Sequence, residues 1–379
     1  MLSPQYFIGL LSGTSIDAVD CVLADFADPR PILVATHSEP ISSALRTDIL
    51  ELCAGKGLSL LHLGETDVIV GRIFAEAVTN LLEKCGLQAS DILAIGSHGQ
   101  TVKHYPAGKN AFTLQIGDPN TISHLTGITT IADFRRKDMA AGGQGAPLAP
   151  LFHQSYFLDK NVRRAVLNVG GIANISLLKH DSETELTGFD SGPGNVLMDW
   201  WISLKQGLPY DSGGQWAESG SVHPRLLAQL LDEPYFALPF PKSTGRELFN
   251  MDWLESKLIT LDTISDADVQ ATLLELTARS IAQSADWTGR GIQEVAVCGG
   301  GAHNSALLRR LAQLIPDIKV FSSARLGLSP NWVEGMAFAW LANKTWKGES
   351  IDCTSVTGSS KPCILGGIYL AETGNRPPR

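Results

Sequence analysis

The chain has 379 residues, of which 44% are hydrophobic and 18% are charged. This length exceeds that of one ordinary core and indicates two domains, and the composition excludes disordered, collagen-like and coiled-coil classes. The net charge of −9 is spread along the chain and the longest basic run is Arg135-Arg136-Lys137, which argues against nucleic acid as a partner.

The first predicted elements are two strands joined by a tight glycine turn. Apolar stretches run from Tyr6 to Leu11 and from Val19 to Ala24, on either side of Ser12-Gly13-Thr14-Ser15. A third strand is expected from Pro31 to Thr36. Consecutive strands joined by short turns predict an antiparallel meander.

A helix and a short strand follow the meander. The helix is predicted from Val68 to Lys84, with Gly86 closing it, because apolar residues recur at helical spacing. These residues are Val70, Phe74, Ala77 and Leu81. The strand, Leu93 to Gly96, leads into the polar cluster Ser97-His98-Gly99-Gln100-Thr101, a candidate site because ligands of α/β sheets bind where strands end.

The opening pattern returns in the second part of the chain. Strands at Phe112 to Ile116 and Ile128 to Ala132 precede a glycine-rich segment, Ala140 to Pro150, which is the first candidate boundary. A strand from Ala165 to Val169 then leads through Gly170-Gly171 into further strands. These are Ile172 to Leu178 and a strand that ends at Phe189. Each glycine turn presents backbone N–H groups and lets an anion approach closely.

A third glycine turn, Cys298-Gly299-Gly300-Gly301-Ala302, follows a predicted strand from Glu294 to Val297. It precedes a helix expected from Asn304 to Leu314. Further helices are predicted around Leu274 to Ala285 and from Trp332 to Trp346.

These turns predict a nucleotide-binding protein. Each turn alone also fits an ordinary hairpin, but two glycine-cornered hairpins and a glycine turn before a helix, in this order, predict a nucleotide held between two lobes. The hairpins would hold phosphates and the third turn would approach the adenosine. Neither a P-loop nor a dinucleotide-binding glycine motif is present. Mg²⁺ would bridge the phosphates, with Asp17 orienting its waters, unless Asp17 is a turn-capping aspartate.

The segment Gly188-Phe189-Asp190-Ser191-Gly192-Pro193-Gly194-Asn195 carries the first candidate for catalysis. Its carboxylate, Asp190, stands at the end of an apolar strand, and an ionised carboxylate there can take a proton from a sugar hydroxyl or a water. The alternative is an aspartate in a local turn before a helix.

Further polar clusters mix hydrogen-bonding side chains with glycines, as a carbohydrate pocket requires. They are Gly117-Asp118, Ala132 to Arg136, Gly142 to Pro147 and Lys242 to Glu247. His98 fits a ligand contact as well as a capping histidine. Arg135 and Arg136 fit bidentate partners of a substrate carboxylate, or surface ion pairs.

The cysteines and the N-terminus exclude other classes. The six cysteines are scattered without a C-x-x-C pair, which predicts buried free thiols rather than a zinc site or disulfides. No basic region followed by an apolar run begins the chain, and no segment has about 18 consecutive apolar residues, so we expect a cytoplasmic protein without membrane contact.

The chain resembles the anhydro-N-acetylmuramic acid kinase family over nearly its whole length. The motifs that carry this resemblance are Leu11 to Asp20, Ser97 to Thr101, Ala132 to Asp138, Gly142 to Pro147, Asn168 to Gly171, Phe189 to Asn195, Lys242 to Glu247, Cys298 to Gly301 and Glu334 to Trp340. Leu11 and Ala18 depart from the methionine and glycine that are usual in the family. Ala18 would matter only if its backbone needed a positive φ.

The resemblance implies a set of contacts for each ligand. ATP, with Mg²⁺, would contact Ser12, Gly13, Thr14, Ser15, Ile16, Asp17, Ala18, Val19, Asp20, Asn168, Gly170, Gly171, Gly299, Gly300, Gly301 and Asn304. The sugar would contact His98, Gln100, Asp133, Arg135, Gly192 and Asn195.

The implied reaction opens the 1,6-anhydro bridge of an amino sugar with water while O6 receives the γ-phosphoryl group. Asp190 would deprotonate the water, and Glu334 would help to hold the sugar or the water. Alternatively, Glu334 is a helix N-terminal carboxylate favoured by the dipole. The product is N-acetylmuramic acid 6-phosphate, an intermediate of peptidoglycan recycling. The resemblance is also compatible with a homodimer.

The expected fold is a two-lobed α/β fold of the actin/hexokinase-like (ribonuclease H-like) type. Each lobe would have a mixed sheet flanked by helices, with a cleft between the lobes. The N-terminal lobe would comprise residues 1–133 and 348–379, and the C-terminal lobe residues 134–347. A kinase of a different sugar and an actin-type ATPase without sugar transfer remain as alternatives.

Overall fold

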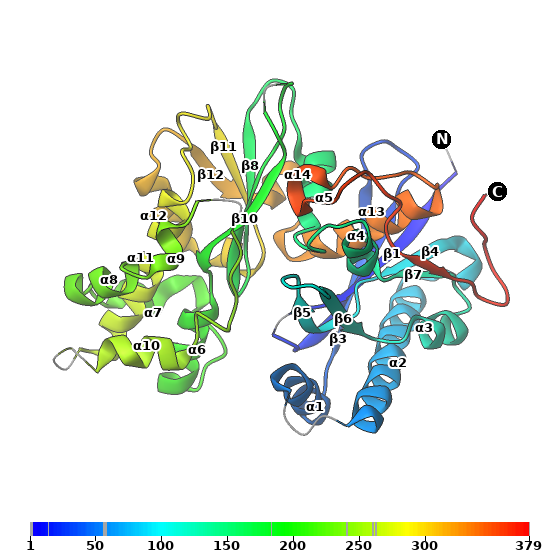
Figure 1. The fold of residues 1–379 in the computed structure, drawn as a ribbon, viewed down its shortest axis with the longest axis horizontal. Helices are drawn as coiled ribbons and strands as arrows, with labels where there is room; N and C mark the ends of the chain where they lie inside the picture. The colour runs from blue at the N-terminus through cyan, green and yellow to red at the C-terminus, as the bar shows by residue number, and fades with distance from the viewer. Residues whose placement is uncertain are drawn as a thin grey trace. The chain divides into compact units, whose positions relative to one another are not determined.

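The computed structural model describes residues 3–13, 15–55, 59–182, 184–239, 242–259, 261 and 264–378. The chain forms two compact units, traced in Figure 1: unit 1 comprises residues 1–156 and 332–379, and unit 2 comprises residues 157–331. Within the described residues, no helix is both long enough and apolar enough to cross a membrane.

Unit 1 contains a six-stranded mixed sheet in the order β13-β7-β4-β1-β2-β3. Its strands are β1 (Tyr6–Ser12), β2 (Ala18–Asp25), β3 (Ile32–Pro40), β4 (Ile92–Ser97), β7 (Thr130–Ala132) and β13 (Gly367–Tyr369). The predicted antiparallel meander is confirmed, because β2 pairs antiparallel with both β1 and β3. β4 runs parallel to β1, and β7 runs parallel to β4. The C-terminal tail returns to this sheet, since β13 pairs with β7.

Helices and a two-stranded ribbon complete unit 1. They are α1 (Ser43–Ala54), α2 (Leu60–Cys85), α3 (Pro119–Thr126), α4 (Phe134–Ala140), α5 (Ala149–Phe157), α13 (Val333–Trp346), α14 (Thr354–Thr357), β5 (Gln100–Tyr105) and β6 (Phe112–Ile116). The predicted apolar stripe of α2 is buried, and Gly86 ends the helix at φ 66° as expected. The helix begins earlier than predicted, because the Ser59 hydroxyl caps it by accepting from the N–H of His62.

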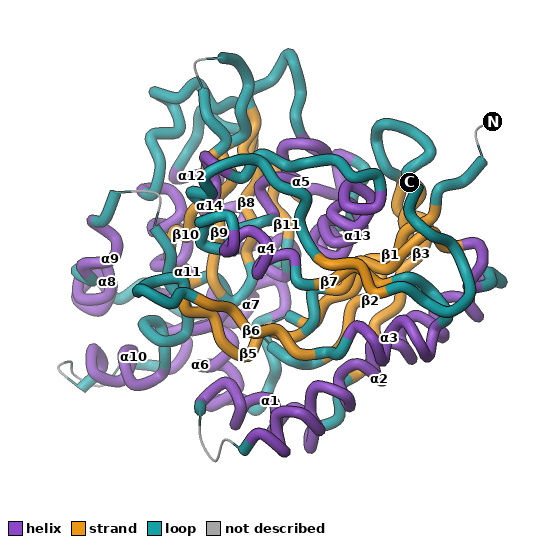
Figure 2. The backbone as a smooth tube through the Cα atoms, turned by 45° about the vertical axis from the view of Figure 1, so that its right-hand side comes forward, coloured by secondary structure: helices purple, strands orange, loops and turns teal. Residues whose placement is uncertain are grey.

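Helix α13 packs directly on the sheet of unit 1 (Figure 2). A Cβ at Gly9 in β1 would collide with the Gly335 carbonyl of α13, and a Cβ at Gly335 would collide with the side chain of Val22 in β2. A Cβ at Gly96 in β4 would collide with the main chain of α13 at Phe338. This close packing explains why unit 1 resumes at residue 332. The units divide near residues 156 and 331, whereas the sequence predicts boundaries at 133 and 347. The last long helix belongs with the N-terminal sheet rather than with the second lobe.

Unit 2 contains a five-stranded sheet in the order β10-β9-β8-β11-β12. Its strands are β8 (Arg164–Val169), β9 (Ile172–Leu177), β10 (Thr187–Pro193), β11 (Glu294–Cys298) and β12 (Lys319–Ser322). The first three strands are antiparallel, and β8, β11 and β12 are parallel. The first five strands of each sheet therefore lie in the order third, second, first, fourth, fifth, and β13 adds a sixth strand in unit 1. This order is the predicted ribonuclease H-like α/β arrangement.

The helices of unit 2 lie around this sheet. They are α6 (Val196–Gln206), α7 (Gln215–Ser219), α8 (Pro224–Leu231), α9 (Pro234–Ala237), α10 (Met251–Leu258), α11 (Asp266–Gln283) and α12 (Ser305–Leu314). The helix expected around Leu274 to Ala285 is present as α11, but it begins at Asp266, where the Ser265 hydroxyl caps it by accepting from Asp268 N–H. The predicted free thiols are confirmed for all six cysteines, of which three are fully buried and three are half-buried.

The prediction that the third strand of unit 2 ends at Phe189 is wrong, because β10 continues to Pro193. Its pairing with β9 shifts register between Asp190 and Gly192, and this irregularity lets the strand continue through glycine and proline. Asp190 therefore lies inside a strand rather than after one.

Candidate active site

Asp190 is held in unit 2 by groups from three other segments. Its carboxylate accepts a hydrogen bond from the backbone N–H of Thr244 at 2.9 Å and another from the side-chain amide of Asn174. Its own N–H donates to the carbonyl oxygen of Lys242 at 2.9 Å. The hydroxyl of Tyr235 donates to its carbonyl oxygen at 2.7 Å. The donors to its carboxylate are remote in sequence, which distinguishes this site from the local turn that we considered as an alternative.

This environment adjusts the acidity of Asp190. Burial raises the pKa of the carboxyl to about 6, the hydrogen bonds from Thr244 and Asn174 oppose that rise, and the charge of Glu247 adds to it. A general base works best when its pKa lies near the working pH while it remains largely ionised. Asp190 meets both conditions.

The second glycine hairpin and the start of α6 form one backbone structure. The N–H of Asn195 donates to Gly170 O at 2.8 Å, and the N–H of Gly194 donates to Gly171 O at 2.8 Å. The side-chain amide of Asn195 donates to Val169 O at 3.2 Å. A Cβ at Gly194 would collide with the Gly170 carbonyl, so this approach requires glycine.

The third glycine turn packs against the same hairpin. Gly299 has φ 76° and donates to Pro330 O at 3.0 Å, and a Cβ on it would meet the side chain of Asn168. A Cβ at Gly301 would overlap the side chain of Val169. The turn continues through Gly300, at the start of a 3₁₀ turn that ends at His303.

Asn304 begins helix α12 rather than only following the turn. Its Oδ1 accepts the N–H of Leu307 at 3.0 Å, so the side-chain oxygen is committed to capping the helix. A contact between Asn304 and adenosine, as predicted, would therefore depend on its amide group. Asn followed by Ser-Ala-Leu-Leu is a recognisable N-cap pattern, so the sequence carried this signal.

The first glycine hairpin lies in unit 1. The N–H of Ile16 donates to Gly13 O at 3.2 Å, which closes a turn, and the positive φ of 56° falls on Ile16 rather than on Ala18. Ala18 lies in β2, so its difference from the usual glycine does not affect the turn. The Oγ of Ser12 is buried and has no hydrogen-bond partner among the described residues. Thr14, a predicted phosphate contact, lies outside the described residues.

The remaining residues of this hairpin differ in their accessibility. The carbonyl oxygen of Ser15 accepts from Arg46 Nε at 3.0 Å. Asp17 has a side chain that is 69% exposed, 3.5 Å from the same Arg46 Nε. Val19 is fully buried in the core, and Asp20 accepts a hydrogen bond from the Ser38 hydroxyl at 2.6 Å. Because the side chain of Val19 is buried, this residue could reach a ligand only through its backbone.

The residues of the first hairpin fit a magnesium ion held mainly by a nucleotide. Asp17 offers an accessible carboxylate, and the buried Oγ of Ser12 lacks a partner. Among the described residues Asp17 belongs to no group of three potential ligands. Mg²⁺ characteristically keeps several waters and takes one or two carboxylates plus phosphate oxygens, which agrees with this donor set.

His98 and Arg135 form a half-buried pair in unit 1. The Nδ1 atom of His98 lies 2.9 Å from Gly99 O, and Arg135 Nε donates to His98 Nε2 at 2.9 Å. His98 must therefore carry its proton on Nδ1 and accept through Nε2. Burial and the charge of Arg135 lower the pKa of His98, which keeps the ring neutral. Both ring nitrogens are engaged within the protein, so His98 positions Arg135.

The guanidinium of Arg135 is half-buried. Burial lowers its pKa to about 10, and the negative charges of Glu334 and Asp138 act in the opposite direction. Its Nη1 donates to Gly145 O at 2.9 Å. Glu334 lies exposed in the first turn of α13, so the structure is compatible both with a helix-dipole role and with a ligand contact.

The other predicted sugar contacts fall into two groups. Gln100 is buried, and its Oε1 has no hydrogen-bond partner among the described residues. Asp133, in contrast, accepts from the Tyr369 hydroxyl at 2.7 Å and pairs with Arg136 at 3.3 Å. Arg136 thus forms the surface ion pair that we considered for it. Gly192 has φ 151°, and a Cβ there would lie 2.7 Å from the ring of Phe236.

Sequence reasoning missed the partners that hold these residues. Asn174, Tyr235 and the Thr244 N–H reach Asp190 from 16, 45 and 54 residues away. No local pattern marks such contacts. Lys242 and Thr244 did lie in a polar cluster that the sequence singled out.

Comparison with known proteins gives a consistent result. A family model described as anhydro-N-acetylmuramic acid kinase matches residues 5–371. Proteins of the same name from Shewanella sp. (strain ANA-3) and Coxiella burnetii (strain Dugway 5J108-111) are each 51% identical over 371 residues, or 98% of this chain and 100% and 99% of theirs. A solved ROK family glucokinase from Streptomyces griseus is similar at 12% identity and a TM-score of 0.40, over 89% of this chain and 99% of that chain.

Proposed function

The chain belongs to the anhydro-N-acetylmuramic acid kinase family, and we propose that it converts 1,6-anhydro-N-acetylmuramic acid, water and ATP to N-acetylmuramic acid 6-phosphate and ADP. The chain is a phosphotransferase with an alcohol group as acceptor. The cleavage of the anhydro ring, a role in peptidoglycan recycling and a cytoplasmic location, where ATP is available, are parts of the proposal.

The observation that supports this reaction best is the environment of Asp190. A pKa of about 6 leaves about 90% of the carboxylate ionised at pH 7, while burial keeps it basic enough to accept a proton. In the proposed step, Asp190 removes a proton from the water that attacks the anomeric carbon. The bond between that carbon and O6 breaks, O6 attacks the γ-phosphorus, and ADP leaves with the electrons of the broken P–O bond.

The glycine turns supply the proposed nucleotide contacts. Backbone N–H groups at a glycine turn stabilise phosphate oxygens, and β8 and β9 are joined in unit 2 by such a turn, Gly170-Gly171, which the start of α6 supports by donating to its carbonyl oxygens. In unit 1, Ser12 and Asp17 would hold Mg²⁺ through water. Bound Mg²⁺ would neutralise charge that develops on the phosphates.

The polar cluster of unit 1 supplies the proposed sugar contacts. Gln100 offers its unpartnered Oε1, and Arg135 offers a positive charge that His98 and Gly145 hold in place. A half-buried guanidinium suits the carboxylate of an acidic sugar, because ion pairing strengthens as water is excluded. The Asp133 carboxylate, already used by Tyr369 and Arg136, would contribute through these partners.

An assay of ADP release tests the proposal. The acceptors are 1,6-anhydro-N-acetylmuramic acid, N-acetylmuramic acid, N-acetylglucosamine and glucose, each with wild type and Asp190→Asn. We expect release only with the anhydro sugar and a loss of at least about 10²-fold in the variant. In ¹⁸O-water, early product should carry the label on the anomeric carbon and none on the phosphate.

The alternatives predict different outcomes. A kinase of another sugar would release ADP faster with an ordinary hexose. An actin-type ATPase would release ADP at the same rate without sugar and would place ¹⁸O on phosphate. If Asp190→Asn kept wild-type activity, Asp190 would not be the catalytic base, but the assigned substrate would be unaffected.

A further inference from the structure

Lys242 lies in a segment that contacts Asp190 on both sides. The carbonyl oxygen of Lys242 accepts the N–H of Asp190, and two residues later Thr244 N–H donates to the Asp190 carboxylate, both at 2.9 Å. The segment 242–244 therefore extends alongside β10 at the proposed base. Any movement of this segment would change the hydrogen bonding of the carboxylate.

The ammonium group of Lys242 anchors this segment to α9. Its Nζ donates to Tyr235 O at 3.0 Å and to Phe236 O at 3.1 Å, and it lies 4.6 Å from the centre of the Tyr235 ring. These are two donor contacts and one cation–π contact from a single side chain. Because the ammonium and the backbone belong to the same residue, these contacts of the ammonium also restrict the movement of residues 242–244.

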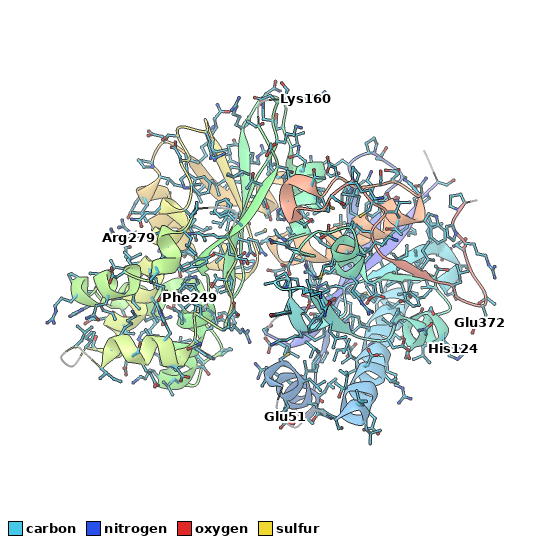
Figure 3. All side chains as sticks on the ribbon, in the orientation of Figure 1. Glu51, His124, Lys160, Phe249, Arg279 and Glu372 are labelled. Atoms are coloured by element: carbon cyan, nitrogen blue, oxygen red, sulfur yellow. The ribbon has the colours of Figure 1, made fainter. Side chains whose placement is uncertain are left out.

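The anchor point is itself rigid. Tyr235 packs edge-on against Phe249, labelled in Figure 3, with ring centres 5.8 Å apart, and Phe236 stacks on Phe249 at 5.6 Å. Phe249 is fully buried. The Tyr235 hydroxyl also donates to Asp190 O. One aromatic cluster thus supports both the lysine and the main chain of the base.

On the premise of the proposed reaction, we propose that Lys242 is a positioning residue that holds the Thr244 N–H against the Asp190 carboxylate. Lys242 contacts neither reacting group in this scheme and acts through the segment that it anchors. The buried hydroxyl of Thr244, which has no partner among the described residues, belongs to the same anchored segment.

Several charged and titratable groups lie near Asp190, so a test must distinguish their electrostatic effects from the effect of the Thr244 hydrogen bond. Glu247 and Tyr235 are coupled to it electrostatically, and Asn174 is its other hydrogen-bond donor. The charge of Lys242 itself could act on Asp190 through space, whereas the proposed role acts through the Thr244 N–H. Titration and amide exchange measured on the same variants distinguish these two routes.

The experiment uses Lys242→Met, Lys242→Arg and a matched control, Lys205→Met. Lys205 also lies 4.6 Å from an aromatic ring centre, that of Trp201, and pairs with Asp266. The carboxyl titration of Asp190 is followed by ¹³C NMR of aspartate-labelled protein, assigned with Asp190→Asn. Hydrogen exchange of residues 242–249 is followed by mass spectrometry, and the pH dependence of kcat by ADP release.

We expect Lys242→Met to raise the titration midpoint of Asp190 by about one pH unit, because a lost N–H donor to a charged acceptor is worth about that much. Exchange in residues 242–249 should accelerate at least about tenfold, and the acidic limb of kcat should move with the midpoint. Lys242→Arg should restore most of each effect, and Lys205→Met should change none. If Lys242→Met does not fold, Lys242→Gln replaces it.

Two outcomes would overturn the inference. A midpoint that stays within about 0.2 unit of wild type, or a raised midpoint with unchanged amide exchange, would show that Lys242 does not act by holding the segment. Because the titration and the exchange need no substrate, they test the inference even if the wild type releases no ADP with any sugar. That last result would remove the proposed function alone.

Discussion

The raised pKa of Asp190 makes a quantitative prediction about stability. A carboxyl whose pKa rises from 3.8 in the unfolded chain to about 6 in the fold stabilises the native state only while it is protonated. The difference is about 2.2 units, and at 1.36 kcal/mol per unit this corresponds to about 3 kcal/mol. The contribution is fully present below pH 3.8 and is lost as the pH rises through 6.

Asp190→Asn removes this titration while keeping the shape of the side chain. Its free energy of unfolding, relative to that of the wild type, should therefore rise by up to about 3 kcal/mol between pH 4 and pH 7.5, because the wild type loses this contribution and the variant does not. Asparagine still offers an oxygen to the Thr244 N–H, so any other effect of the substitution is a constant offset. The slope of the difference against pH, rather than its absolute value, carries the prediction.

The assay is urea denaturation of both proteins at half-unit pH intervals, without ligands. The exposed carboxylate Asp17 provides the control, because Asp17→Asn also removes one negative charge. A difference between Asp190→Asn and wild type that stays flat from pH 4 to 7.5 would refute the reasoning, since an unperturbed carboxyl gives no slope in that range.

Three further predictions concern other parts of the two units. Gly301→Ala should lower the free energy of unfolding by about 1–3 kcal/mol, because its Cβ would overlap a neighbouring side chain, whereas Gly13→Ala, with open space around the new atom, should leave thermal unfolding unchanged. Thr357→Val should cost about 1–3 kcal/mol in the same measurement, because it removes the hydroxyl that donates to the buried carboxylate of Asp138 at 2.8 Å. EDTA should abolish ADP release, and added Mg²⁺ should restore it. Asp17→Asn should raise the Mg²⁺ concentration needed for half-maximal rate. If variant and wild type need the same Mg²⁺ concentration, Asp17 is not part of the ion site.

The sequence predicted most strands and turns of the two sheets because these are marked locally, but it did not predict the short edge strands β12 and β13. The strand at Phe112 to Ile116 matches β6 at both ends, and Gly86 ends α2 as expected. The errors arose where tertiary pairing overrides local pattern. β10 continues past Phe189 because β9 pairs with it across an irregularity, although Gly192 and Pro193 look like a strand end.

The sequence proposed the residues of the candidate site, but it did not reveal how they interact. The resemblance located Asp190, His98 and Arg135 from short motifs. It did not reveal that His98 accepts a hydrogen bond from Arg135, a pair separated by 37 residues in the chain. Which nitrogen of a histidine is free, and which carboxylate is buried, depends on contacts that no motif encodes.

In each unit, a segment distant in sequence forms hydrogen bonds that fix an aspartate of a motif. In unit 2 the segment 242–244 holds Asp190. In unit 1 the hydroxyl of Thr357 donates to Asp138, whose other oxygen accepts Gly145 N–H at 2.7 Å, and Gly145 O in turn accepts Arg135. Residues far from any ligand therefore fix the groups proposed to bind it.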